Sequence, residues 1–66
     1  GGLAVTGGAA VQGGLTIATN SLVISNGNPP ASAGATGVAG QVAWDSSFFY
    51  VCVATNTWKR VAISTF

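Results

Sequence analysis

The front of the chain, residues 1–25, repeats a pattern of apolar and polar positions every six residues. One apolar column has members six apart, and a second apolar column lies two positions before it. The columns are Val5, Val11, Ile17 and Val23, and Leu3, Ala9 and Leu15. Residues two apart in a strand share a face, and the Gly-Gly pairs between blocks suit corners with positive φ. The pattern predicts very short strands joined by Gly-Gly corners, with a last strand over residues 21–25.

Such short strands are not stable alone, because ordering the backbone costs roughly 1–2 kcal/mol per residue. One solution is a single-chain β-helix, and the other is several identical chains that each supply one side of every layer. A single-chain helix of hexapeptides uses about three blocks for each coil, so this segment makes little more than one coil. With three chains, every block completes a layer. A flexible Gly/Ala linker is the remaining alternative, although a linker has no reason to keep β-branched residues in register.

Residues 26–40 interrupt the repeat. The run Asn26-Gly27-Asn28-Pro29-Pro30 ends any strand, since proline lacks a backbone donor and favours a stiff, extended backbone. Residues 31–40 hold only Ala, Ser, Gly and Thr and one Val, so they can lie against a surface but cannot form a core. We expect an ordered, irregular connector between two domains.

Residues 41–66 contain all six aromatic residues of the chain. The pattern predicts an antiparallel meander with strands over residues 41–44, 48–55 and 58–64 and turns at 45–47 and 56–57. Alternate positions of the middle strand are apolar on both faces. These positions are Phe48, Tyr50, Cys52 and Ala54 on one face, and Phe49, Val51 and Val53 on the other.

One face of this meander is expected to cover a small core together with Trp44 and Trp58. The other face must meet another chain or the connector, because water would leave a large exposed apolar patch. The predicted fold class is all-β: an intertwined homotrimer with an N-terminal triple-stranded β-helix-like stem and a C-terminal three-stranded antiparallel β knob. The domains are a stem (1–25), a connector (26–40) and a knob (41–66).

Charged side chains make up 5% of the sequence, namely Asp45, Lys59 and Arg60, and histidine is absent. A single carboxylate without histidine excludes, within one chain, a Ser/His/Asp triad, a pair of catalytic acids and a His-rich metal site. We therefore expect a protein that is not an enzyme, with no catalytic residue, cofactor or metal.

The same scarcity of charge bears on partners. Lys59 and Arg60 are adjacent and form no basic stripe, so nucleic-acid binding is not expected. No apolar run reaches the roughly 18 residues that span a bilayer, so no membrane insertion is expected, and the start lacks the pattern of a signal peptide. The chain lacks an initiating Met, which indicates a fragment.

Cys52 is alone and is expected to be a buried, inert thiol. A chain this small and this weakly charged is expected to self-associate.

Residues 43–62 resemble a terminal module of bacteriophage tail fibres and related virion proteins. The resemblance rests on a strand ending in aromatic-Asp, an aromatic-rich Tyr-x-Cys-x-Ala strand and a Trp-Lys-Arg strand. In this sequence the motifs are Trp44-Asp45, Tyr50-Val51-Cys52-Val53-Ala54 and Trp58-Lys59-Arg60. The repeat that begins Gly-Gly-Leu-Ala-Val-Thr is similar to the triple-stranded β-helical stems of phage fibres. The resemblance implies a homotrimer in the virion, in which a shaft runs into a compact head that serves virion structure or attachment to the host cell.

Six residues are candidates for receptor or trimer contacts. Asp45 and Arg60 form a plausible charged pair, although Asp at a turn commonly binds its own backbone and Arg commonly stacks on an aromatic ring. Aromatic rings beside amides can bind sugars, although core packing explains the rings and turn formation explains the amides. The candidates are Trp44, Asp45, Tyr50, Asn56, Trp58 and Arg60, and the amides of Asn26 and Asn28 are further candidates for sugar contacts.

Three functions follow as hypotheses. The first is the C-terminal tip of a trimeric phage tail fibre or spike that attaches to a host-surface glycan or protein, with three tips that raise avidity. The second is a purely structural virion part, which decorates a capsid or registers fibre chains without receptor binding and contacts other virion proteins. The third is a lectin-like monomer. Burial of all three rings, Trp44, Tyr50 and Trp58, favours the second over the first.

Overall fold

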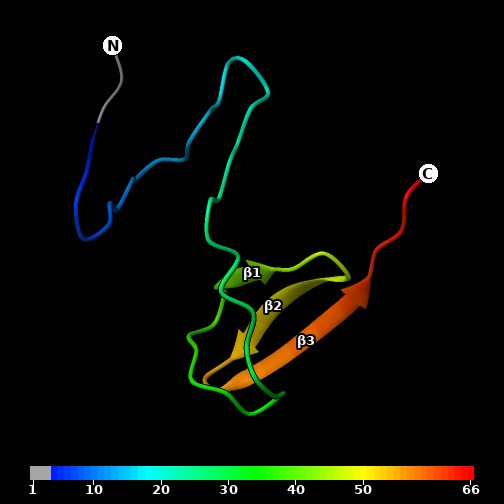
Figure 1. The fold of residues 1–66 in the computed structure, drawn as a ribbon. Coiled ribbons are helices and arrows are strands. Elements are labelled where there is room, and N and C mark those ends of the chain that lie inside the picture. Colours follow the sequence, from blue (N-terminus) through cyan, green and yellow to red (C-terminus); the bar gives the residue numbers. More distant parts are fainter. Residues whose placement is uncertain (1–3) are drawn as a thin grey trace.

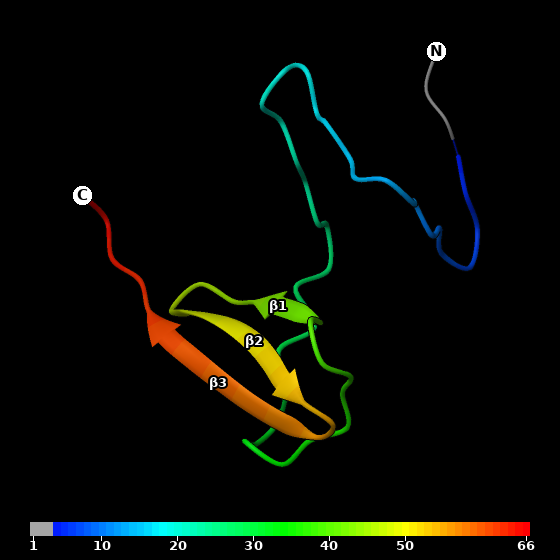
Figure 2. The same ribbon diagram turned by 180° about the vertical axis from the view of Figure 1, so that it is seen from behind.

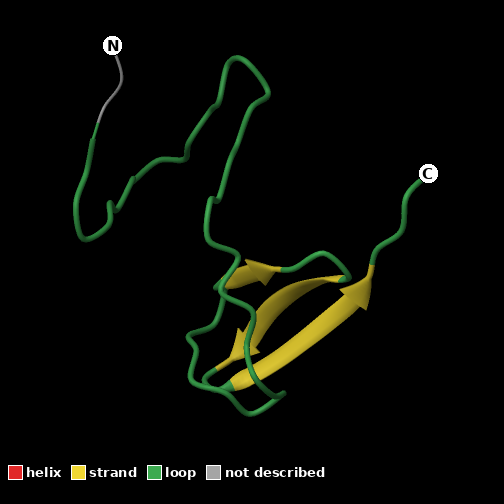
Figure 3. Cartoon of the chain, viewed as in Figure 1, coloured by secondary structure: helices red, strands yellow, loops and turns green. Residues whose placement is uncertain are grey.

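A computed structural model describes residues 4–66, and the first members of the repeat, Gly1, Gly2 and Leu3, lie outside this range. The described chain is all-β, and no residue within it is helical. Three strands form one antiparallel sheet in the order β1-β2-β3, as Figures 1 and 3 show. They are β1 (Val42–Trp44), β2 (Phe48–Ala54) and β3 (Thr57–Ala62). The predicted all-β class and the three-stranded meander are confirmed.

The turn between β2 and β3 lies one residue earlier than predicted. Thr55 and Asn56 form the turn, and β3 begins at Thr57 instead of Trp58 and ends before Ser64. Asn56 has φ 52°, a left-handed conformation that asparagine tolerates better than most residues. The left-handed conformation of Asn56 therefore places this residue at the second position of the turn, after Thr55.

One face of the sheet packs on a small core. The core residues are Ala43, Tyr50, Cys52 and Trp58, and Cys52 is fully buried, as expected. The connector covers this face, in front of the sheet in Figure 1 and behind it in Figure 2. Trp58 donates its backbone N–H to the Ala33 carbonyl oxygen at 2.8 Å and its Nε1–H to the Ala35 carbonyl oxygen at 3.1 Å. The small residues of the connector therefore serve as the second layer.

Close packing of the connector depends on Gly37. A Cβ atom at this position would lie 2.8 Å from the Trp58 ring. Glycine therefore lets the backbone lie directly on the ring.

The opposite face of the sheet is open, and Trp44 lies on it. The prediction that Trp44 shares the core with Trp58 is wrong: Ala43 pairs with the buried Tyr50, whereas Trp44 pairs with Phe49. Strand neighbours alternate between faces, so only one of Ala43 and Trp44 points inward. Tyr50 and Trp58 already fill the covered face, and a small residue suffices beside them.

The end of the repeat and the start of the connector are bonded to β1. Trp44 donates its backbone N–H to the Gly27 carbonyl oxygen at 3.0 Å and its Nε1–H to the Ile24 carbonyl oxygen at 2.9 Å. A Cβ atom at residue 27 would overlap the Trp44 carbonyl oxygen. A glycine is therefore required where the connector crosses the edge strand β1.

Residues 4–25 extend away from the sheet without forming strands (Figure 1). The Gly-Gly corners do adopt positive φ, with 88° and 109° at Gly7 and Gly8 and 85° and 102° at Gly13 and Gly14, which confirms that prediction. The strand expected over residues 21–25 is not formed, because a strand needs a partner to complete its hydrogen bonds. The intertwined stem and the homotrimer stay predictions. No helix among residues 4–66 is long and apolar enough to cross a membrane.

Candidate functional site

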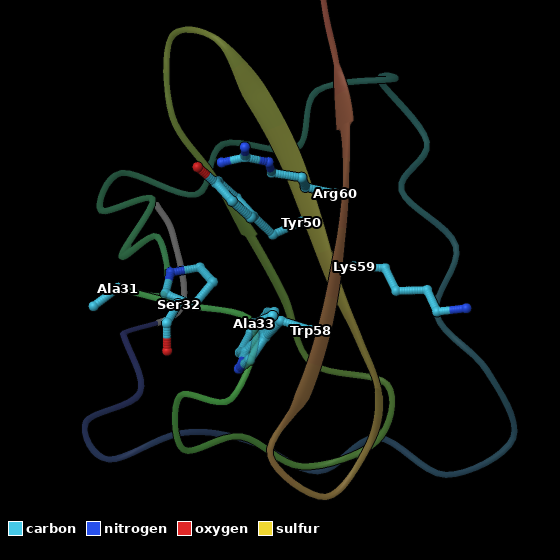
Figure 4. A pocket seen from close by; sticks show the side chains of 8 residues that line it. Ala31, Ser32, Ala33, Tyr50, Trp58, Lys59 and Arg60 are labelled. Carbon is cyan, nitrogen blue, oxygen red and sulfur yellow. The ribbon is translucent and has the colours of Figure 1, made fainter.

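A groove of about 360 Å³ lies on the covered face, between the start of the connector and the sheet. Tyr50 forms one part of its wall from β2, and Trp58 and Arg60 form another from β3 (Figure 4). The groove is lined by Pro30, Ala31, Ser32 and Ala33 of the connector and by Tyr50, Trp58, Lys59 and Arg60 of the sheet. Lys59 borders the groove through its position on β3, and its side chain points away from it (Figure 4).

Asp45 organises the end of the sheet next to the groove. Its Oδ1 accepts the backbone N–H groups of Ser47 and Phe48, each at 2.8 Å. The bond to Ser47 is the turn contact predicted from the sequence. Its Oδ2 accepts the Tyr50 hydroxyl at 2.5 Å. Both carboxylate oxygens of Asp45 are therefore engaged by the chain itself.

These hydrogen bonds shift the pKa values of Asp45 and Tyr50 in opposite directions. The Tyr50 hydroxyl and then the Ser47 N–H hold the pKa of Asp45 below its ordinary value of 3.8, because they stabilise the ionised carboxylate. The Asp45 carboxylate in turn raises the pKa of Tyr50 above 10.0, because the bond needs the hydroxyl proton. Around neutral pH the pair consists of a carboxylate and a neutral phenol.

Arg60 stacks on an aromatic ring. Its guanidinium carbon lies 4.0 Å from the centroid of the Phe48 ring, and the Phe48 and Tyr50 centroids are 6.0 Å apart at a tilt of 50°. The contact with Phe48 corresponds to the stacking alternative for Arg60. The positive charge of Arg60 also lowers the pKa of Asp45, although less than the Tyr50 hydroxyl does. The main partner of Asp45 is Tyr50.

Asn56 lies at the far end of the hairpin and binds the connector. Its Oδ1 accepts the Gly37 N–H at 3.0 Å, and its own N–H donates to the Gly37 carbonyl oxygen at 2.9 Å. Asn26 makes a local contact, since its Oδ1 accepts the Asn28 N–H at 3.1 Å. Asn56 therefore fixes the connector over Trp58.

The structure brings together four of the six candidates. Tyr50, Trp58 and Arg60 line the groove, and Asp45 supports it through Tyr50. Trp44 lies on the open face, and Asn56 lies at the hairpin turn. Sequence reasoning missed the wall formed by residues 30–33, because small residues without periodicity give no signal of which surface they contact.

The arrangement is suited to binding. The wall combines two aromatic rings, a proline and an arginine with five N–H donors.

Two curated proteins are similar to this chain. A capsule K30/K69-specific depolymerase of Klebsiella phage K5-2 is 64% identical over 39 residues, which are 59% of this chain and 5% of that protein. A capsule K30/K69-specific depolymerase of Klebsiella phage K64-1 is 53% identical over 36 residues, which are 54% of this chain and 5% of that protein. The chain thus matches about a twentieth of each relative. No protein-family model and no solved structure matches it.

Both relatives are bacteriophage proteins, so they support the phage origin that the resemblance implied. The individual strand motifs are not tested by these matches. The expectation that the protein is not an enzyme is wrong: both relatives are named depolymerases, and a depolymerase is an enzyme. Composition misled here, because the residues of a stretch that matches about a twentieth of each relative do not report on the chemistry of the rest of those relatives.

Proposed function

We propose that this chain is a module of a phage capsule depolymerase carried on the virion tail, where it serves attachment to the host surface. The observation behind the proposal is the 64% identity over 39 residues with a capsule-specific depolymerase. The target would be the polysaccharide of the host capsule. In this view the polymer is cleaved by the larger enzyme, and this module contributes binding and assembly.

The module would work as an assembly of three copies. Several large apolar side chains of the repeat are more than half exposed: Val5, Val11, Leu15, Leu22 and Val23. Exposed apolar side chains that recur in this way are suited to an interface with further copies of the chain. A net charge of +1 offers little repulsion against self-association.

A second candidate is a registration module that aligns the chains of the spike without binding a receptor. It is favoured by the burial of Tyr50 and Trp58, each 7% exposed. Trp44 argues in the other direction, because it is 38% exposed. The exposures of the three rings therefore do not favour one candidate alone, and a binding experiment is needed to separate the two.

The test uses the fluorescently labelled 66-residue chain. Light scattering measures its mass, and flow cytometry measures its binding to Klebsiella cells with a K30 or K69 capsule and to capsule-free mutants of the same strains. We expect trimers that bind encapsulated cells and not capsule-free cells. Trimers that ignore the capsule would favour the registration module, and monomers that ignore the capsule would overturn both candidates.

A further inference from the structure

Arg60 is the charged group that the groove offers to a ligand. Asp45 directs its oxygens to Tyr50, Ser47 and Phe48, so its carboxylate is already engaged. The Arg60 guanidinium carbon lies 4.0 Å from the centroid of the Phe48 ring, and Arg60 is exposed. Stacking uses the face of a guanidinium and leaves its N–H donors at the edge, in a fork that fits a carboxylate.

The aromatic walls of the groove are held in place. Trp58 is fixed by its bond to the Ala35 carbonyl oxygen at 3.1 Å, and Tyr50 is fixed by its bond to Asp45 at 2.5 Å. Tyr50 and Trp58 are each 7% exposed, so each offers only a small part of its surface to the groove. Rigid aromatic walls bind the apolar side of a ligand at a low cost in conformational entropy.

The size of the groove limits the ligand. Its volume of about 360 Å³ is at the lower end of the range for small-molecule sites, roughly 300–1,000 Å³. It therefore suits one or two units of a sugar chain, with Pro30 and Ser32 on the connector side.

From these features we infer that the groove binds a saccharide unit bearing a carboxylate, with the acid on Arg60 and the sugar ring against Tyr50 and Trp58. The choice of a saccharide rests on the proposed function, and the choice of a ligand that bears a carboxylate rests on the positive charge of Arg60. The groove is on the covered face of the sheet, whereas Trp44 and Phe49 lie on the open face. Copies that associate through the open face would leave the groove accessible.

The test uses the full chain and two small probes that differ at one carbon, methyl glucuronide and methyl glucoside. Nuclear magnetic resonance follows the two indole N–H signals. Trp58 lies in the groove, and Trp44 lies on the opposite face and serves as an internal control. We expect methyl glucuronide to shift the Trp58 signal and not the Trp44 signal, and methyl glucoside to bind more weakly.

Matched variants separate the groove from general attraction between charges. Arg60→Gln and Lys59→Gln each remove one positive charge from β3, but the Lys59 side chain points away from the groove (Figure 4). Arg60→Gln should weaken binding about tenfold or more, as expected for loss of a hydrogen-bonded charge, and Lys59→Gln should have little effect. Ala31→Trp, at an exposed groove position, should block binding without changing charge, and it decides the matter if Arg60→Gln fails to fold.

Several results would overturn the inference: an unshifted Trp58 signal, equal affinity for the two probes, or equal losses in the Arg60 and Lys59 variants. If the Trp58 signal is unshifted in a trimer that still binds encapsulated cells, the groove is excluded as the saccharide site and the proposed function stands. A chain that binds methyl glucuronide but ignores encapsulated cells would overturn the proposed function and leave the groove as a saccharide site.

Discussion

At the scale of single residues, two contacts join separate parts of the knob and the connector. Asp45 closes the turn before β2 and also holds the Tyr50 hydroxyl. Gly37 brings the connector backbone onto the Trp58 ring. Each contact can be tested by a single substitution.

The Asp45–Tyr50 bond predicts a dependence of stability on acid. The folded chain holds the pKa of Asp45 below its value of 3.8, so the contribution is complete above that value and is lost as the pH falls through the folded pKa. Tyr50→Phe removes the largest cause of the shift and should move acid unfolding to higher pH. Circular dichroism from about pH 5 to about pH 1 measures the transition.

Asp45→Asn is the control for this prediction. The chain contains no other Asp or Glu side chain, so the variant should lose most of the acid dependence and retain only that of the terminal carboxylate. Identical acid profiles for the unmodified chain and Tyr50→Phe would contradict the assigned role of the hydroxyl.

Gly37→Ala should destabilise the knob. Its Cβ would lie 2.8 Å from the Trp58 ring, and overpacking of this kind costs about 1–3 kcal/mol. Gly34→Ala is the matched control, because a Cβ there meets no atom within 4 Å and the backbone φ is not positive. Urea denaturation of both variants measures the difference, and equal stabilities would show that the connector moves away from Trp58 without cost.

At the scale of elements, the connector acts as the missing layer of the knob. A three-stranded sheet needs one face covered for independent stability, and residues 33–37 supply that cover through backbone groups. The hairpin between β2 and β3 is fixed to this layer by Asn56. The hairpin and the connector should therefore unfold together.

Substitutions of Asn56 separate its two roles. Asn56→Gly keeps the left-handed backbone of φ 52° and loses the bond from Gly37, which should cost about 1 kcal/mol. Asn56→Ala loses the bond and also adds about 1–2 kcal/mol of backbone strain. Thermal denaturation should rank the stabilities as Asn, then Gly, then Ala. If the alanine variant equals the glycine variant, the turn has another conformation available.

At the scale of the whole molecule, one copy leaves many large apolar side chains exposed to solvent. Trp44, Phe49 and Val61 share the open face, since Phe49 pairs with both of the others, and all three are exposed. The apolar residues of the repeat are exposed as well. Further copies of the chain are the partner that we propose for both surfaces.

Association through the open face predicts that stability depends on concentration. The denaturation midpoint should rise as the protein concentration rises, since linked assembly stabilises the folded chain. Val61→Lys places a charge on the open face and should lower both the midpoint and the mass measured by light scattering. Thr36→Lys, at an exposed position of the connector, adds the same charge and should change neither, and a compact monomer at every concentration would contradict the proposed assembly.

The sequence determined the three strands of the knob and the Gly-Gly corners of the repeat, because these depend on local chemistry. Alternation of apolar residues gave β2 its two faces, the Gly-Gly pairs took positive φ, and Asp45 bonded the backbone two residues on. The phage resemblance also came from the sequence, through its motifs. The enzymatic nature of the relatives was missed, since a stretch that matches about a twentieth of each relative does not report on the chemistry of the rest of those relatives.

Only the tertiary structure decided which residues share a face and what covers it. The register of β1 against β2 put Ala43 inside and Trp44 outside, and the path of the connector formed the groove around Arg60. These outcomes depend on contacts between residues far apart in the chain. A pattern of neighbouring residues fixes which positions alternate, but the contacts made at each face depend on how the whole chain packs.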